Sequence, residues 1–241
     1  MSEENFVFFG DTKHMPYGEK TEQQLVEYSK YAFEFFEKLS VKAVVLACNT
    51  TSAVVYDKLN GKYNFKLYPL IQSVASSFCH DDVKTIGVFA TPATINSHAY
   101  SKWISKYNKD VEVIEISCPE WVKMVENNDL QSTESKEYIK VKMNEMMQHC
   151  PGKIILGCTH YPYLLKELNK YAKSDIFVNP AKTYANIIRE DLIQNDLLTD
   201  VSRVGVDMFF VSGSPEKFKV AGKMFYNLDE KMVLQLNDLF L

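Results

Sequence analysis

Short apolar runs alternate with amphipathic stretches along most of the chain. The run from Ala43 to Ala47 is almost continuously apolar, as expected of a strand that is covered on both faces. The stretches between such runs repeat their apolar residues at helical spacing, which is typical of helices with one buried face. This alternation predicts an α/β fold with mostly parallel sheets.

The same pattern gives a range for each element. The clearest is a helix that begins after Thr21, because Thr21 and Gln24 form a capping box and apolar residues follow at helical spacing as far as Leu39. Strands are predicted at residues 6–9, 43–47, 66–71, 85–90, 111–116, 153–157, 175–178 and 206–211. Further helices are predicted at residues 49–59, 92–106, 119–127, 132–149, 161–172, 181–195 and 215–226, with a closing helix over 231–241.

One segment of the chain is echoed by another. Residues 44–50 read as an apolar strand, a small residue, a cysteine and a hydroxyl before a helix, and residues 154–160 read the same way. Because open α/β sheets bind ligands at the carboxyl ends of their strands, the echo suggests two similar halves that present equivalent strand ends to a shared cleft. The alternative is coincidence, since buried strands often end in small residues.

Length and charge exclude several classes of protein. The 241 residues fit one large or two small domains. Lys and Arg number 27 against 31 Asp and Glu, and no basic block exists to neutralise phosphates, which argues against a nucleic-acid or anionic-membrane partner. No apolar stretch approaches the roughly 20 residues of a membrane span, and the first residues are polar and acidic, unlike a secretory signal. We therefore expect a cytoplasmic protein.

The cysteines are the first candidates for chemistry. Cys48, Cys79, Cys118, Cys150 and Cys158 form an odd set without a CxxC pair, which argues against a disulfide framework and a zinc site. Cys48 and Cys158 each follow a strand and precede a helix, where the helix dipole stabilises a thiolate. Two thiols that face one another can remove a proton from one side of a carbon and return one to the other, which inverts a stereocentre. The alternative is that both are small buried apolar residues.

Polar residues accompany both of these cysteines. Asn49, Thr50, Thr51, Thr159 and His160 place amide, hydroxyl and imidazole groups at the two helix starts, where backbone N–H groups can also hold a carboxylate. Together they indicate a small anionic substrate. For each asparagine or threonine taken alone, ordinary N-capping is the alternative.

Motifs along nearly the whole chain resemble one enzyme family. They are Phe9-Gly10-Asp11 with Pro16-Tyr17-Gly18, Ala47-Cys48-Asn49-Thr50, Thr91-x-Ala93-Thr94, Cys118-Pro119 through Glu126, Leu156 to Pro162, and Gly213-x-Pro215-Glu216-Lys217-Phe218. The set resembles the glutamate racemases of the aspartate/glutamate racemase superfamily, enzymes that use two cysteines and no cofactor. The fragment around Cys158 carries the most specific part of this resemblance.

The resemblance implies a role for each matched residue. Cys48 and Cys158 match the two catalytic thiols, one acting as thiolate base and the other as thiol acid, with the roles exchanged for the opposite enantiomer. Asp11, Glu126 and His160 match residues that tune or assist the thiols. The implied substrate-binding residues are Pro16, Tyr17, Gly18, Asn49, Thr50, Thr51, Thr94, Thr159 and His160.

The resemblance also implies two Rossmann-like, flavodoxin-like domains with a cleft between them. We expect the first domain at residues 1–83 plus 181–241 and the second at residues 84–180. No metal and no cofactor are expected, since no GxGxxG, P-loop or recognisable Schiff-base lysine is present. Family members supply D-glutamate for bacterial peptidoglycan and are often dimers, so D-glutamate supply and a homodimer are further expectations.

One part of the family pattern has no counterpart here. Family members begin with a strand and a turn that carries Asp-Ser-Gly, whereas this chain enters the pattern at what resembles the second strand. Such a first strand would be central in a parallel sheet, so its loss would leave its neighbours with unpaired backbone groups, and we expect either that the fold compensates or that the chain is a fragment. Two other functions therefore compete with glutamate racemisation. One is a non-catalytic glutamate-binding or regulatory protein, and the other is a racemase of another small acidic amino acid such as aspartate.

Overall fold

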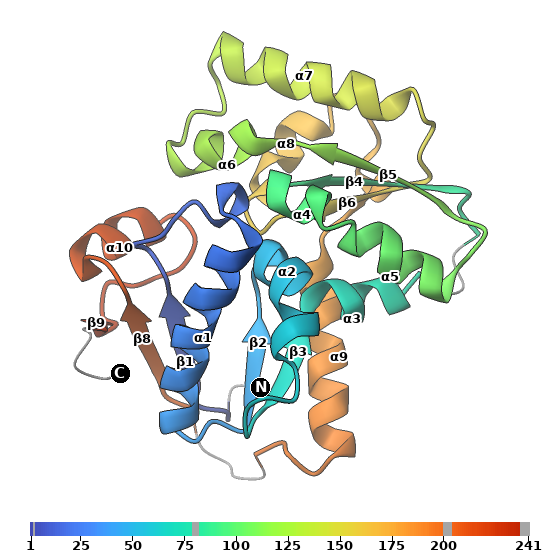
Figure 1. Cartoon of the computed structure of the whole chain (residues 1–241). Helices are drawn as coiled ribbons and strands as arrows, with labels where there is room; N and C mark the ends of the chain where they lie inside the picture. The colour runs from blue at the N-terminus through green and yellow to red at the C-terminus, as the bar shows by residue number, and fades with distance from the viewer. Residues whose placement is uncertain (2, 79–81, 200–203, 237–241) are drawn as a thin grey trace.

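The computed structural model describes residue 1 and residues 3–78, 82–199 and 204–236, and it has the α/β architecture that the alternating pattern predicts (Figure 1). The strands are β1 (Phe6–Gly10), β2 (Ala43–Leu46), β3 (Lys66–Pro69), β4 (Thr85–Ala90), β5 (Glu112–Ser117), β6 (Lys153–Gly157), β7 (Phe177–Val178), β8 (Asp207–Val211) and β9 (Val233–Gln235). The helices are α1 (Glu22–Lys38), α2 (Asn49–Leu59), α3 (Leu70–Ser76), α4 (Pro92–Asn96), α5 (Ala99–Tyr107), α6 (Pro119–Glu126), α7 (Thr133–Met147), α8 (Leu165–Leu168), α9 (Pro180–Gln194) and α10 (Pro215–Gly222). Three short 3-10 helices are η1 (Tyr17–Glu19), η2 (Tyr161–Leu164) and η3 (Ser174–Ile176).

Four parallel strands form one continuous sheet in the order β5-β4-β6-β7. β4 is paired on both edges and is buried from Ile86 to Ala90. Figure 1 shows α7 on one side of this sheet and α5 on the other. All four strands fall within residues 84–180, the range expected for a second domain, although the domain boundaries themselves stay a prediction.

The remaining strands form two smaller parallel sheets, β1-β8-β9 and β2-β3. Among the described strands, β1 pairs only with β8 and β2 pairs only with β3. Figure 1 shows β1 and β2 pointing the same way, with α1 close to both.

Three clusters of buried side chains hold these layers together. The first joins Tyr68 of β3 to Val88 of β4 and extends to α5 and α9, so it connects the two sheet systems. The second lies on the opposite face of the continuous sheet, around Trp121 of α6. The third packs Phe33 of α1 against Val44 of β2. The core thus runs through both halves of the molecule and supports the strand ends between them.

The predicted closing helix over residues 231–241 is wrong in its described part. Val233–Gln235 is strand β9, which pairs in parallel with β8, and residues 237–241 lie outside the described residues. Met232, Leu234 and Leu236 alternate with a period of two, which is the period of a strand rather than of a helix. The edge of β8 that faces away from β1 pairs with this segment, so backbone groups of both strands are satisfied.

The predicted strand over residues 66–71 is too long. It ends at Pro69, and the chain continues as α3, which the sequence pattern missed. Four buried residues of this segment follow helical spacing: Ile71, Val74, Ala75 and Phe78. A helix therefore buries one apolar face of the segment in the core.

The predicted helix over residues 92–106 is interrupted. His98 has a φ of 50°, which separates α4 from α5. A left-handed residue cannot continue a right-handed helix. The helix predicted over residues 161–172 is likewise shorter and consists of η2 and α8.

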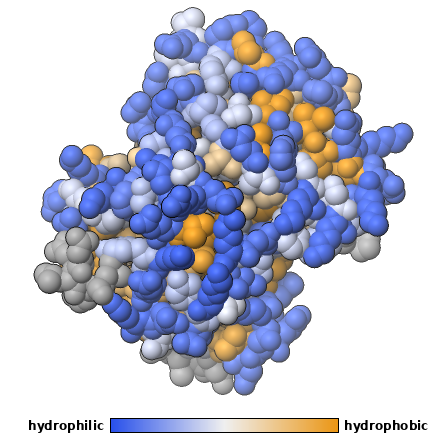
Figure 2. Space-filling view, viewed as in Figure 1, coloured by the Kyte–Doolittle hydropathy of each residue, from blue (hydrophilic) through white to orange (hydrophobic). Residues whose placement is uncertain are grey.

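The face seen in Figure 2 is largely hydrophilic, and its apolar side chains gather mainly over β5 and α7. None of the described helices has both the length and the apolar character needed to cross a bilayer.

Candidate active site

Cys48 stands at the junction of β2 and α2. Its carbonyl accepts a hydrogen bond from the Ser52 backbone N–H at 2.9 Å, and Cys48 is the N-cap residue of α2. The side chain is half-buried. Cys48 therefore lies at the positive end of the α2 dipole, the position that the sequence predicts.

Cys158 follows β6 and is 8% exposed. Its Sγ lies 3.6 Å from Nδ1 of His160, and Nε2 of His160 lies 3.2 Å from Oε1 of Glu126. A carboxylate beside Nε2 favours the tautomer that carries its proton there, which leaves Nδ1 as an acceptor facing the thiol. The three side chains can therefore move a proton from Cys158 to the imidazole ring.

Burial raises the pKa of Cys158 to about 12. Hydrogen bonds from the His160 backbone N–H and the Thr159 hydroxyl lower this pKa, whereas negative charge on Cys48 and on Glu126 raises it. Cys158 is thus a neutral thiol at neutral pH. Cys48 is near enough to act on it electrostatically, although the two cysteines follow strands of different sheets.

Tyr161 holds the segment that carries His160. Its hydroxyl donates a 2.7 Å hydrogen bond to the Cys118 carbonyl, directly before α6. Trp121 of α6 packs edge-on against the Tyr161 ring, with 5.0 Å between the ring centroids. Because α6 ends at Glu126, these contacts fix the carboxylate relative to the imidazole.

Three buried hydroxyl groups link the two sheets beside α2. Thr50 Oγ1 lies 2.8 Å from Thr91 Oγ1 and 3.2 Å from Thr94 Oγ1, and the latter two lie 3.1 Å apart. Gly18 of η1 packs on the same group, since a Cβ there would lie 2.5 Å from Cβ of Thr91. The structure thus brings together Gly18, Thr50 and Thr94, which motifs far apart in the sequence contribute.

The other predicted substrate contacts take different positions. The Tyr100 hydroxyl donates a 2.6 Å hydrogen bond to Oδ1 of buried Asn49. Thr51 is half-buried in the first turn of α2, and Thr159 is exposed beside Cys158. Because Cys48 is the N-cap of α2, N-capping does not explain Asn49 or Thr50.

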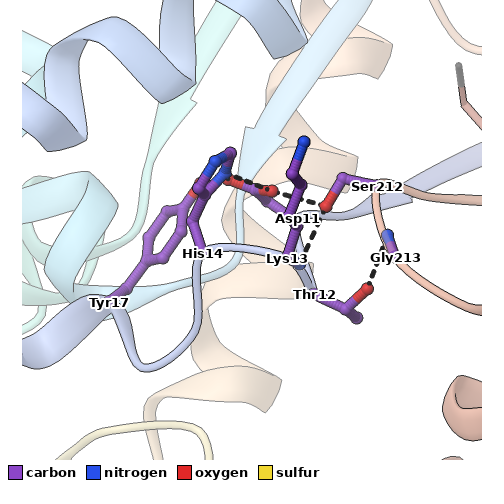
Figure 3. Close-up of polar contacts among 7 residues, drawn as sticks. All are labelled: Asp11, Thr12, Lys13, His14, Tyr17, Ser212 and Gly213. Atoms are coloured by element: carbon purple, nitrogen blue, oxygen red, sulfur yellow. Dashed lines mark hydrogen bonds and ion pairs between the residues drawn. The ribbon is translucent and has the colours of Figure 1, made fainter.

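Asp11 organises the loop between β1 and α1 (Figure 3). Its carboxylate accepts hydrogen bonds from the Tyr17 hydroxyl at 2.5 Å and the Ser212 hydroxyl at 2.6 Å, and lies 2.8 Å from Nδ1 of His14. The His14 ring stacks on Tyr28 of α1, with 3.9 Å between centroids. The loop is therefore held from β8 on one side and from α1 on the other.

This arrangement fixes Tyr17, which directly follows Pro16. Burial raises the pKa of Tyr17, and the hydrogen bond to Asp11 and its charge raise it further, so the phenol stays a proton donor to the carboxylate. Negative charge on Cys48 also raises this pKa, which indicates that Tyr17 lies near the thiol. The contacts of Asp11 favour a role that acts through Tyr17.

Sequence reasoning missed three of these residues. Ser212 directly follows β8, so the rule that site residues gather at the carboxyl ends of parallel strands could have found it. His14 lies within the matched loop, but nothing in the pattern gives it a partner. Tyr100 lies within α5, and no local signal links it to Asn49.

Comparison with known proteins agrees with this geometry. The family model for Asp/Glu/Hydantoin racemases matches residues 4–186. The glutamate racemase of Thermoanaerobacter sp. (strain X514) is 33% identical over 231 residues, which cover 95% of this chain and 85% of that protein. The glutamate racemase of Carboxydothermus hydrogenoformans is 32% identical over 235 residues, 97% of this chain and 87% of that one.

Solved structures give the same picture. The crystal structure of glutamate racemase from Francisella tularensis in complex with D-glutamate is 30% identical, with a TM-score of 0.86 over 98% of this chain and 89% of that one. A glutamate racemase isoform from Bacillus anthracis, 24% identical with a TM-score of 0.90, shares the fold. With three quarters of its length matched by the family model and relatives above 30% identity, this chain belongs to the Asp/Glu/Hydantoin racemase family and, within it, to the glutamate racemases.

Proposed function

We propose that this protein interconverts L- and D-glutamate without a cofactor, using Cys48 and Cys158 as the two proton-transferring groups. The observation that carries this function is the pairing of the thiols. They follow strands of different sheets, interact electrostatically, and one of them contacts an imidazole backed by a carboxylate.

Each turnover moves two protons. A Cys48 thiolate takes the Cα proton from one face of glutamate, and the Cys158 thiol gives its own proton to the opposite face. The products are the other enantiomer, a Cys48 thiol and a Cys158 thiolate, so charge and protons balance. The reverse reaction begins from that second state of the enzyme.

His160 and Glu126 make the second state accessible. A buried thiolate at Cys158 is costly, as its raised pKa shows. Imidazole at 3.6 Å can accept the thiol proton and become a cation, which Glu126 then stabilises at 3.2 Å. The His160–Glu126 pair therefore lowers the free energy needed to ionise Cys158 when that residue must act as a base.

The substrate is held by groups at the two strand ends. Asn49 and Thr50 lie at the start of α2, and Thr159 lies beside Cys158, so amide and hydroxyl donors accompany both thiols. The similarity to the Francisella tularensis enzyme, whose structure contains D-glutamate, supports glutamate as the substrate. D-Glutamate made here would serve peptidoglycan synthesis in the cytoplasm, and we propose a homodimer as the working form.

Deuterium incorporation tests this function directly. L-Glutamate is incubated with the protein in heavy water, and the Cα deuterium content and the circular dichroism signal are followed together. Loss of the L-glutamate signal with one deuterium per inverted Cα is expected. A Cys150→Ala variant is the matched control, because Cys150 is an exposed thiol outside the site.

Two results would decide against the proposal. Well-folded protein that leaves both signals unchanged while still binding glutamate would identify a binding protein instead of a racemase. Turnover of aspartate in preference to glutamate in the same assay would reassign the substrate.

A further inference from the structure

One buried tyrosine contacts both of the chain segments that carry the thiols. Tyr100 of α5 is fully buried. Its ring lies against Gly157, directly before Cys158, since a Cβ at Gly157 would lie 3.1 Å from Cε2 of Tyr100. Its hydroxyl donates a 2.6 Å hydrogen bond to Oδ1 of Asn49, directly after Cys48. A single side chain therefore connects the end of β6 with the start of α2.

Two further contacts fix α5 at this position. The Glu115 carboxylate of β5 accepts a 3.4 Å hydrogen bond from the Ser101 backbone N–H and lies 3.0 Å from Nδ1 of His98, directly before α5. The Lys102 ammonium forms an ion pair with the Asp57 carboxylate of α2 at 2.7 Å. The first contact attaches α5 to the continuous sheet and the second attaches it to α2, so the helix that carries Tyr100 is held from both sides of the site.

The Tyr100 phenol keeps its proton throughout the proposed reaction. Burial raises its pKa, and negative charge on Cys158 and on Glu115 raises it further. A thiolate at Cys158, as in the second state of the enzyme, therefore favours the protonated phenol. Tyr100 remains a hydrogen-bond donor to Asn49 whichever thiol is ionised.

This hydrogen bond determines which way the Asn49 amide faces. A side-chain amide has an acceptor oxygen on one side and two N–H donors on the other. With Oδ1 bound to the phenol, Nδ2 points away from α5. The opposite orientation would leave the buried phenol proton without an acceptor, since Oδ1 of Asn49 is the one acceptor that the described part of the chain offers it.

Nδ2 of Asn49 is available to a ligand. Within the described residues, Trp121 Nε1 is the one side-chain nitrogen or oxygen that is both sealed from solvent and without a hydrogen-bond partner. Nδ2 of Asn49 has no partner among these residues either, so it must retain accessible surface although the residue as a whole is only 3% exposed. An N–H donor directly after Cys48 can bind a carboxylate.

We propose, on the basis of the glutamate racemisation inferred for this protein, that Tyr100 is a positioning residue that locks the Asn49 amide with Nδ2 toward a carboxylate oxygen of the substrate. Tyr100 itself does not touch the substrate. Without the phenol hydroxyl, the amide can turn its oxygen toward water. Binding then requires the amide to turn back and to leave Oδ1 buried without a donor, which weakens the affinity for the carboxylate.

Tyr100→Phe tests this role, because it keeps the ring against Gly157 and removes only the hydroxyl. We expect KM for glutamate to rise about tenfold, and kcat to change less than about twofold, since the amide binds the ground state and the transition state alike. Tyr107→Phe is the matched control, the same substitution at the other end of α5, where the side chain is 41% exposed. It should leave both constants unchanged, and the melting temperature of each variant reports folding.

A second set of variants shows whether Tyr100 acts through Asn49. Asn49→Ala should raise KM at least as much as Tyr100→Phe, because it removes the donor itself. Adding Tyr100→Phe to Asn49→Ala should raise KM no further, since both changes break one interaction. A general structural role of Tyr100 would instead multiply the two effects.

Equilibrium binding separates this role from the proposed function. Calorimetric titration with racemic glutamate, whose composition racemisation does not change, gives a Kd for each variant. A protein that does not racemise glutamate but binds it about tenfold more weakly after Tyr100→Phe would refute the proposed function and support the role of Tyr100. A protein that racemises glutamate with the same KM and Kd after Tyr100→Phe would refute the role of Tyr100 alone.

Three other outcomes would overturn the proposal. The effects of Tyr100→Phe and Asn49→Ala could multiply in the double variant. Tyr100→Phe could lower kcat and leave KM unchanged, which would show that the hydroxyl acts on Cys158 and not on the amide. Tyr107→Phe could raise KM as much as Tyr100→Phe, which would show that the effect arises from α5 as a whole.

Discussion

Cys48 and Cys158 end equivalent strands, yet their surroundings differ. Cys158 is almost fully buried, lies 3.6 Å from His160, and has its pKa raised to about 12. Cys48 is half-buried at the N-cap of α2, near the tyrosine that Asp11 holds. One thiol is supported by an imidazole and a carboxylate, and the other by a helix start and a loop.

The difference shows that a symmetric reaction does not require symmetric surroundings. The two enantiomers of an amino acid have equal free energies in water, so the equilibrium constant is one. Any change to either thiol must then alter kcat/KM equally in both directions, however unequal the two surroundings are. Variants that change the surroundings of only one thiol at a time therefore test how much each side of the site contributes to turnover.

Removal of either thiol should have the largest effect. Cys48→Ala and Cys158→Ala should each lower kcat/KM by about 10⁴-fold, because each deletes one of two obligatory proton-transferring groups. The rates are measured by circular dichroism starting from each enantiomer, with Cys150→Ala as the control. If only one of the two variants is inactive, the paired-thiol comparison fails.

Alkylation should separate the two thiols without any turnover. The thiolate is the reactive form, and burial raises the pKa of Cys158 from an ordinary value near 9 to about 12. At neutral pH the thiolate fraction of Cys158 is therefore about 10³-fold smaller than that of an ordinary thiol, and it rises about tenfold for each pH unit below 12. Iodoacetamide labelling followed by peptide mass spectrometry measures this profile. Labelling of Cys158 as fast as that of exposed Cys150 at pH 7 would contradict the raised pKa.

Changes to the His160–Glu126 pair beside Cys158 should have the next largest effect on kcat/KM. His160→Asn should lower kcat/KM by about 10²-fold in both directions, because Cys158 then loses the acceptor for its proton. Glu126→Gln should have a smaller effect of about tenfold, since it keeps the shape of the side chain and acts only through the imidazole. The melting temperature of each variant is the control for folding. Equal and full activity of both variants would show that the imidazole takes no part.

The sequence accounts for the thiols better than for their partners. Cys48 and Cys158 could be predicted because strand ends and helix starts leave local patterns in the chain. The roles of His160 and Glu126 followed only from the family resemblance, and their contact with one another was not predicted, since nothing local shows that η2 packs on α6. The Ser212–Asp11 contact was missed because it joins residues about two hundred positions apart.

The fold was predicted with the same strengths and weaknesses. Buried parallel strands such as β4 and β6 were located within a residue because their apolar runs are continuous. Val233–Gln235 was assigned to a helix because strand pairing with β8 depends on a distant edge that the local sequence does not contain. The edges of β1 and β2 that face away from β8 and β3 illustrate the same limit, since a strand pattern shows that a strand forms but not whether both of its edges pair with described strands.

The network on the Cys48 side should give the smallest effects, graded by distance from the thiol. Tyr17→Phe removes the hydroxyl that bonds Asp11 and should lower kcat/KM about tenfold, whereas Ser212→Ala removes a second support of the same carboxylate and should lower it about threefold. Asp11→Asn should resemble Tyr17→Phe if Asp11 acts by holding the phenol. Kinetics of the Asp11→Asn, Tyr17→Phe double variant decide this. Because both changes break one interaction, the double variant should be no slower than the slower single variant, while multiplied effects would mean that Asp11 acts on Cys48 by another route.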